Sequence, residues 1–493
     1  DGLAAVVSDS STPPEQLRPR LRCTPGYRLD AIRPADHYLK RFMSADDSQP
    51  IVARLNKGVR SAGARIAFVS RSAFGERLEL CRYRLGNGLD ILLLPDGSAP
   101  VLSYHTWFRV GSRHEKPGKT GLAHLFEHLM FNQTRNLEAG AFDRLLEAAG
   151  GHTNAATWVD WTYYYDNLPS SELRLAVQLE ADRMANLVLE ERLVQVEKEV
   201  VANERRFRVD DSVEGTMDEL LYATSFKRHP YRQPTIGWMK DIEGLTAEDC
   251  RRFYRTYYAP NNATLVVAGD MDEQNALGLI QHHYGSIKRQ RITPGKTTAE
   301  PRQRRERRLD LRRPTTSERF LLGYRAPGFG DPDHPALTLA CEVLFGGRSS
   351  RLYRKLVREG ELAVDAQGTV SPFQQPGLFE IAVTLRQGRD WRMALAVVEA
   401  EIEKLRNRPV GKRELRKVKN RVDLSFLQGL EKAEGKAERA AFYQTVLGDA
   451  GELFRRRDLY LSMGADDILH AARRYLDRRQ RTSIVVTPGS ESG

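Results

Sequence analysis

The chain has 493 residues, of which 41% are hydrophobic and 29% charged, and its formal net charge is +11. This length is too great for one hydrophobic core and predicts at least two domains of a globular protein. The apolar runs are too short for a membrane-spanning helix, and the four widely spaced cysteines predict neither a disulfide framework nor a thiolate metal site. The start at Asp1, without a visible leader, decides nothing about export.

Residues 1–75 are polar and carry scattered prolines and arginines, which predicts an N-terminal extension with one candidate strand at 66–69. Residues 76–287 alternate between strand-like and helix-like patterns, which is typical of helices packed on a sheet. The predicted strands of this part are 89–94, 101–108, 162–168 and 264–268. The predicted helices are 121–131, 142–149, 171–187 and 247–258.

The pentad His124-Leu125-Phe126-Glu127-His128 lies in the first of these helices. Because a residue advances about 100° around a helix, the two imidazoles and the carboxylate share one face. Zinc hydrolases need this arrangement, in which imidazoles hold the metal and a carboxylate accepts the proton of a metal-bound water. The order reverses the commoner H-E-x-x-H, and such reversed motifs occur among zinc peptidases. The alternative is a half-buried helix whose two histidines have no chemical role.

A third ligand is expected further along the chain, because catalytic zinc usually takes three protein ligands. Residues 193–207 have helical periodicity, and Glu197 and Glu204 fall on the same side as the predicted apolar stripe. A carboxylate that faces a core is costly unless it is paired or bound to metal. We predict Glu204 as the ligand and Glu197 as a supporting carboxylate, with pairing of Glu204 to Arg205 or Arg206 as the alternative. The predicted stripe consists of Leu193, Val196, Val200, Val201 and Phe207.

With these residues the chain resembles the insulinase and pitrilysin family of zinc metallopeptidases, in its mitochondrial-processing-peptidase-like branch. The pentad is followed by a glutamate 76 residues beyond its last histidine, as in that family. Residues 83–115 resemble the family's opening strands, 150–169 its active-site edge strand and 257–270 its closing strand. The resemblance implies a zinc-binding peptidase domain at residues 76–287. It also implies one Zn²⁺ per chain with Glu127 as the general base, and its ligands would be His124, His128 and Glu204.

The predicted edge strand is short-chained and flanked by glycines, so another backbone can approach it closely. The resemblance implies that an extended peptide adds to this strand through main-chain hydrogen bonds. The alternative is an ordinary interior strand. We expect packing roles for the neighbouring aromatic residues Trp158, Trp161 and 163–165. The predicted substrate-binding residues are Asn154, Ala155, Ala156 and Thr157.

Residues 288–313 are a basic, proline-punctuated linker, and residues 314–493 repeat the strand and helix alternation. Much of the positive charge lies in this linker, which raises the question of a nucleic-acid surface. No aromatic residues interleave with the basic ones, and no nucleic-acid module is recognisable. We therefore predict a solvated hinge and no nucleic-acid partner, while an acidic partner surface or a preference for acidic peptides stays open.

The second half reads as a copy of the first. Residues 319–347 align with the strand, loop and metal helix of the first half, and Glu342 lies opposite Glu127. Leu339 and Val343 replace the two histidines, so this half is predicted to keep the fold without the metal; ordinary helix patterning is the alternative. The resemblance implies an α/β fold of two homologous domains. Each would be a mostly antiparallel sheet covered by helices, and together they would form half of a clam-like chamber.

In the resembled family the second copy carries an arginine and a tyrosine, seven residues apart, that hold the substrate backbone. Val357 and Val364 stand at these positions here. Valine can neither hydrogen-bond a peptide carbonyl nor stabilise an oxyanion. The missing pair predicts a heterodimer in which a homologous subunit supplies it. A homodimer or monomer stays open, because a small register shift would bring in Arg351, Arg354 or Arg358.

These observations predict a zinc-dependent endopeptidase that hydrolyses peptides or unfolded polypeptides as the metal-bearing subunit of such a pair. The alternative is a non-catalytic scaffold homologue of the same family within a larger complex. We expect a soluble protein, and the compartment stays open between bacterial cytoplasm and periplasm.

Overall fold

The computed structural model describes residues 48–292 and 298–489, and residues 1–47 of the predicted extension lie outside the described residues. The first half contains a sheet in the order β1-β2-β3-β7-β4-β6-β5. Its strands are β1 (Ile66–Phe74), β2 (Leu78–Leu85), β3 (Asp90–Pro95), β4 (Val101–Phe108), β5 (His152–Thr157), β6 (Thr162–Pro169) and β7 (Ala263–Gly269). Its helices are α1 (Ser48–Leu55), α2 (Leu122–Leu129), α3 (Ala141–Ala148), α4 (Leu173–Asn186), α5 (Glu191–Arg205), α6 (Val213–Ser225), α7 (Met239–Glu243), α8 (Ala247–Tyr257) and α9 (Glu273–Tyr284).

The second half contains a smaller sheet in the order β10-β11-β9-β12-β8. Its strands are β8 (Arg307–Arg313), β9 (Arg319–Arg325), β10 (Ala363–Val370), β11 (Leu378–Leu385) and β12 (Arg481–Pro488). Its helices are α10 (Asp333–Phe345), α11 (Trp391–Asn407), α12 (Lys412–Gln428), α13 (Ala433–Leu447), α14 (Glu452–Ser462) and α15 (Ala465–Tyr475). No helix of the described ranges is long and apolar enough to cross a membrane.

The two sheets share one topology. Strands β3, β7, β4, β6 and β5 follow one another across the first sheet as β8, β12, β9, β11 and β10 do across the second. The pair β3·β7 is parallel, as is β8·β12, and the other corresponding pairs are antiparallel. In each half a helix, α2 or α10, follows the central strand. The predicted α/β fold of two related sheets covered by helices is thus confirmed, while the clam-like chamber stays a prediction.

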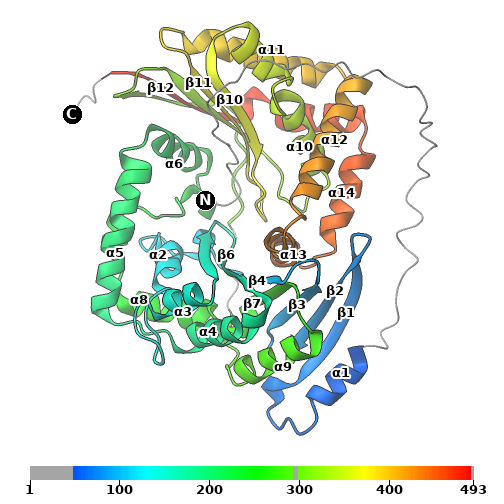
Figure 1. The fold of residues 1–493 in the computed structure, drawn as a ribbon. Coiled ribbons are helices and arrows are strands. Elements are labelled where there is room, and N and C mark those ends of the chain that lie inside the picture. Colours follow the sequence, from blue (N-terminus) through cyan, green and yellow to red (C-terminus); the bar gives the residue numbers. More distant parts are fainter. Residues whose placement is uncertain (1–47, 293–297, 490–493) are drawn as a thin grey trace, which may run out of the picture. The chain divides into compact units, whose positions relative to one another are not determined.

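Each sheet is covered on one face by helices of its own half and on the other by a helix of the other half. Helix α13 packs against β4 and β7 of the first sheet, and α6 packs against β9 and β12 of the second (Figure 1). Strand β7, which pairs with β3 and β4, is buried along its whole length. Because α6 and α13 each pack on the sheet of the other half, two apolar clusters connect the halves.

Two predicted boundaries differ from the observed elements. The predicted extension, residues 1–75, contains α1 and the whole of β1, which pairs with β2 in the first sheet. The last residues of the predicted basic linker form β8, which pairs with β12 in the second sheet. Its side chains alternate between half-buried and exposed. Arg308 and Arg312 are exposed, while Leu309 and Leu311 pack inward on the same face as the half-buried Arg307 and Arg313.

Candidate metal centre

Helix α2 presents the pentad because its other residues are buried. Leu122, Leu125 and Leu129 are among the side chains that pack into the first core, and within α2 only His124, Glu127 and His128 are half-exposed. The start of the helix is fixed by Glu115, whose carboxylate accepts hydrogen bonds from Gly121 N at 3.0 Å and Ala123 N at 2.7 Å. The apolar pattern therefore sets the orientation of the polar face.

Helix α5 stands beside α2 and brings a carboxylate to this face (Figure 1). Its position is fixed by two buried cations that donate to main-chain carbonyls. Lys198 Nζ donates to Glu243 O and Leu245 O at 2.8 Å, and Arg205 Nη1 donates to Gly237 O at 2.7 Å. These bonds tie α5 to the segment around α7.

The predicted apolar stripe of α5 is partly wrong. Leu193 and Val201 are buried as expected, but Val196 is 53%, Val200 45% and Phe207 78% exposed. The buried face instead includes Val194, Ala202, Lys198 and Arg205. Lys198 and Arg205 donate hydrogen bonds to main-chain carbonyls. These bonds allow the two charged residues to occupy buried positions where the sequence pattern predicted apolar ones. Glu197 and Glu204 face α2 and not the core.

The structure brings His124, His128 and Glu204 together, with one ligand atom of each within 4.8 Å of the others. Glu204 Oε2 lies 3.6 Å from His124 Nε2 and 3.3 Å from His128 Nε2. A tetrahedral zinc ion with bonds near 2.1 Å separates its ligand atoms by about 3.4 Å. The three side chains therefore fit one zinc ion, and this fit depends only on distances between the residues themselves.

Two further residues support these side chains. Glu197 Oε2 lies 3.6 Å from His128 Nδ1, the ring nitrogen that does not face Glu204, and Glu197 Oε1 accepts from Asn132 Nδ2 at 2.9 Å. Arg208 Nε lies 3.1 Å from Glu204 Oε1, the oxygen that does not face the imidazoles. Such contacts fix ligand orientation in metal sites. Sequence reasoning missed Arg208, although its spacing of four residues from Glu204 was a usable signal.

The electrostatics of the two histidines differ. Burial lowers the pKa of His124 to about 4, despite the opposing pull of Glu204, and its Nδ1 is buried without a hydrogen-bond partner. Burial acts in the same direction on His128, but the carboxylates of Glu197 and Glu204 outweigh it and raise the pKa to about 9. Contact with His128 in turn lowers the pKa values of both carboxylates. A dication would compete with a proton for His128, because the same carboxylates that raise its pKa attract both.

Glu127 lies on the same face in a different environment. Burial raises its pKa, and the nearby Thr157 side chain and His128 oppose that shift. Glu127 Oε2 and Thr157 Oγ1 are both buried, and neither has a hydrogen bond of good geometry within the described part of the chain. An orphaned, desolvated carboxylate oxygen beside two imidazoles is suited to accept a proton from a bound molecule.

Strand β5 lies at the edge of the first sheet and pairs only with β6. Within residues 154–157, Asn154 is exposed and Ala156 is half-buried. Ala155 and Thr157 are buried. One side of this strand therefore has no neighbouring strand among the described residues. Packing roles are confirmed for Trp161 and Tyr164, which are 3% and 0% exposed, whereas Trp158 is 44% exposed and that expectation is wrong.

The second half lacks polar groups at the predicted arginine and tyrosine positions. Val357 packs partly buried against the second core, and Val364, in β10, is 56% exposed. Of the arginines proposed as substitutes, Arg351 is bound by Glu414 at 2.6 Å and Arg354 lies 3.2 Å from Glu359.

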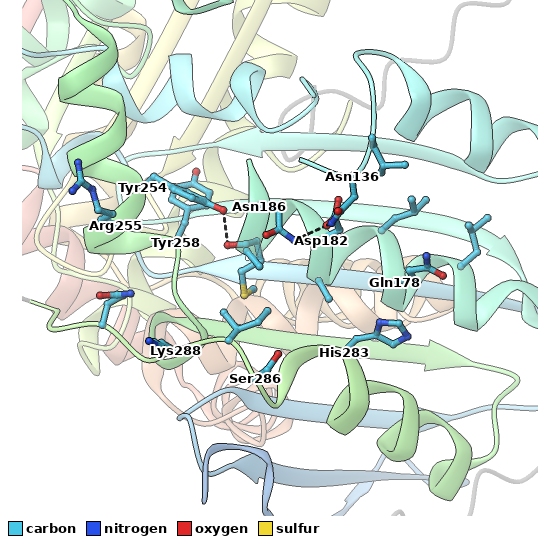
Figure 2. A pocket seen from close by; sticks show the side chains of 18 of the residues that line it. Asn136, Gln178, Asp182, Asn186, Tyr254, Arg255, Tyr258, His283, Ser286 and Lys288 are labelled. Carbon is cyan, nitrogen blue, oxygen red and sulfur yellow. Dashed lines mark hydrogen bonds between the residues drawn. The ribbon is translucent and has the colours of Figure 1, made fainter. Parts of the chain in front are cut away.

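A separate cavity of about 870 Å³ lies among α4, α8 and the segment after α9, and it contains no residue of the candidate metal centre (Figure 2). Its wall includes Asp182, which accepts from Asn186 Nδ2 at 2.7 Å, and Tyr254, whose hydroxyl donates to Met184 O at 2.6 Å. The rings of Tyr254 and Tyr258 touch Phe126 of α2 from this side. The cavity therefore lies behind the metal helix.

Each half of the chain matches a different family model. Residues 92–238 match the family model described as insulinase, peptidase family M16, and residues 244–422 match the model described as the peptidase M16 inactive domain. The first match contains the pentad and Glu204, and the second contains Leu339 and Val343.

Among relatives, zinc protease PqqE of Helicobacter pylori is 31% identical over 82% of this chain and 92% of its own length. An uncharacterized zinc protease of Mycobacterium leprae is 31% identical over 63% of this chain and 70% of its own length. The crystal structure of a protease from Helicobacter pylori has a TM-score of 0.80 at 31% identity and covers 83% of this chain and 99% of that one.

Proposed function

The chain belongs to the insulinase family of peptidases, peptidase family M16, and from that premise we propose that it is a zinc-dependent endopeptidase. The observation that carries the proposal is the convergence of His124, His128 and Glu204 within 4.8 Å of one another. These three residues would hold the metal. Bound zinc would polarise the scissile carbonyl and make a water molecule acidic near neutral pH.

The chain's own residues supply the proton transfers. Glu127 Oε2, buried and without a hydrogen-bond partner, accepts the proton that the attacking water loses and returns it to the nitrogen of the leaving amine. Glu197 and Arg208 hold His128 and Glu204 in orientation through the atoms that do not face the metal position.

Substrates are proposed to be peptides or unfolded polypeptides, because binding uses an extended backbone. The unpaired side of β5 offers the main-chain groups of residues 154–157 to such a chain. Main-chain pairing gives affinity with little side-chain selectivity, so a broad range of sequences can bind. Thr157 at the end of β5 lies beside Glu127, which puts the scissile bond near this end of the strand.

We further propose that a homologous subunit supplies the arginine and tyrosine that this chain lacks. Val357 and Val364 leave the substrate carbonyl without a donor from those positions, and Arg351 is already engaged by Glu414. Removal of one such donor costs about 10²–10³-fold in turnover in other hydrolases. The isolated chain is therefore expected to bind zinc and to turn over poorly.

The test measures hydrolysis of an unfolded polypeptide by the zinc-loaded chain, alone and in an equimolar mixture with a homologue from the same genome that carries the pair and lacks the pentad. A rise of about 10²–10³-fold in the mixture is expected. A mixture made with Glu127→Gln controls for activity of the homologue itself. Full turnover by the chain alone would rule out the need for a partner.

A non-catalytic scaffold is the second candidate function. It is favoured by the valines at 357 and 364, and the retained ligands and base oppose it, since a scaffold needs none of them. Metal analysis separates the two: near-stoichiometric zinc in the purified chain supports the enzyme, and no zinc after reconstitution supports the scaffold.

A further inference from the structure

Trp158 is exposed where tryptophan is usually buried. Its side chain is 44% exposed, whereas Trp107 is fully buried and Trp161 and Trp391 are 3% and 4% exposed. A large, rigid apolar ring in solvent costs free energy unless something covers it in the functional state. The surroundings of the Trp158 ring therefore indicate what could cover it.

The main chain of Trp158 is held firmly. Its N–H donates to Trp161 O at 2.9 Å, and its carbonyl accepts from Ser112 N at 3.1 Å. Gly111 makes room for this contact, because a Cβ at that position would lie 2.2 Å from Trp158 O. The ring is thus mounted on a fixed backbone, which lowers the entropy cost of contacting another molecule.

The buried carboxylate of Asp160, two residues after Trp158, connects this turn to both halves of the chain. Asp160 accepts from Tyr231 Oη at 2.9 Å and from Gln374 N at 2.8 Å, and it lies 3.0 Å from Arg113 Nε. Gln374 belongs to the second half, as does Phe373, whose ring centroid lies 6.3 Å from that of Trp158. The Trp158 ring therefore stands where the two halves meet.

This turn begins at the end of the substrate strand. Thr157, the last residue of β5, lies beside Glu127, and Trp158 is the next residue. A peptide paired along β5 has its residues on one side of the scissile bond against the strand. With the scissile bond near Thr157, the residues on the other side of that bond would continue beyond β5 toward the turn that carries Trp158.

We propose that Trp158 is a specificity-determining residue that forms the wall of a substrate subsite for one large apolar or aromatic side chain, on the side of the scissile bond that extends beyond β5. This inference rests on the proposed peptidase function and adds a side-chain preference to it. Stacking on the ring and removal of its exposed surface from water favour such a side chain about tenfold over a small polar one.

The test measures binding and not turnover, so that it does not depend on a partner subunit. Fluorescently labelled decapeptide pools, one with phenylalanine and one with serine at the central positions, are titrated with the zinc-loaded full chain carrying Glu127→Gln. The expected result is about tenfold tighter binding of the phenylalanine pool. Adding Trp158→Ala should abolish this preference and leave the serine pool unchanged, while Trp158→Phe should retain most of it.

Met393→Ala, at a 56% exposed residue of α11, is the matched control and should leave both pools unchanged. Zinc content and thermal stability of each variant verify folding. An undiminished preference in Trp158→Ala, with zinc bound, would overturn the subsite and leave the peptidase proposal intact. Failure of the zinc-loaded chain to bind either pool would overturn both.

Discussion

The two halves of this chain share a strand order but differ at one helix pair, and the difference separates fold from chemistry. In the first half α2 and α5 face each other across His124, His128 and Glu204. In the second half the corresponding helix α10 has Leu339 and Val343 fully buried. The sheet and its helices form in both cases, so the residues of the candidate metal centre are not needed for the fold.

The two halves also differ in the surroundings of Glu127, the proposed base, and of the glutamate aligned with it. Glu342, aligned with Glu127, lies 3.1 Å from Arg421 Nε of α12, a half-exposed ion pair. Among the described residues, no arginine or lysine forms an ion pair with Glu127, and its Oε2 is buried without a hydrogen-bond partner. A paired surface carboxylate is a poor base because its negative charge is already stabilised, whereas a desolvated one is a better base.

The largest effect is expected from removing the carboxylate of Glu127, with Glu342 of the second half as the control. Glu127→Gln should lower peptide hydrolysis by about 10²–10⁴-fold, since the amide cannot accept a proton, while zinc content stays unchanged. Glu342→Gln, at the aligned position of the second half, should leave hydrolysis within about twofold of the wild type. Initial rates with the partner present, together with metal analysis, measure both. Retained turnover in Glu127→Gln would remove this residue from its proposed role.

A smaller effect is expected behind the ligands. Glu197→Gln should weaken zinc affinity by about 10–100-fold, because the amide holds His128 Nδ1 less strongly than the carboxylate does. The carboxylate contributes to the His128 pKa of about 9, so zinc uptake near pH 7.5 should also release fewer protons in the variant. Competition with a chelator gives the affinity, and calorimetry in two buffers gives the protons. Unchanged values for both would show that Glu197 does not support the site.

The smallest effect concerns the contact between the halves. Glu380 of β11 is buried against Tyr222 of α6, which donates a hydrogen bond to it, and burial raises the pKa of its carboxyl from 4.5 to about 7. Between pH 4.5 and about pH 7, Glu380 is deprotonated in the unfolded chain but still protonated in the folded one. Its contribution to the free energy of unfolding therefore falls as the pH rises through this range. Glu380→Gln should reduce the stability difference between pH 5 and pH 8 by about 1–3 kcal/mol.

Denaturant unfolding at the two pH values measures this change. Glu403→Gln, at an exposed residue of α11 that lies 3.3 Å from Arg406, is the control and should leave the difference unchanged. An equal pH dependence in Glu380→Gln and the wild type would contradict the assigned cause.

Local patterns predicted several elements correctly, and the three residues predicted as metal ligands lie close together in the structure. The strand predicted at 101–108 is β4 with the same bounds, and the helices predicted around the pentad and at 247–258 are α2 and α8 within about two residues. These signals are local, since periodicity and side-chain type lie within one segment. Glu204 lies beside His124 and His128 as predicted, although it was predicted on an apolar stripe of α5 and in fact faces α2.

Features that depend on long-range packing were not predictable. Lys198 and Arg205 are buried in α5 because distant carbonyls accept their hydrogen bonds, and this displaced the predicted apolar stripe. Strand β8 was hidden within a basic segment because its two inward leucines were outnumbered by arginines. The exchange of α6 and α13 between the halves, and the exposure of Trp158, depend on contacts between residues far apart in the sequence.

The most direct test of the central claim is an X-ray absorption measurement at the zinc edge on the reconstituted full chain. We predict one zinc per chain with two imidazole nitrogens at about 2.0–2.1 Å, one carboxylate oxygen and one light atom from solvent. Loss of the imidazole scattering in a His124→Ala, His128→Ala variant would assign those nitrogens. A zinc ion bound through sulfur, or no zinc retained by the wild-type chain, would contradict the account.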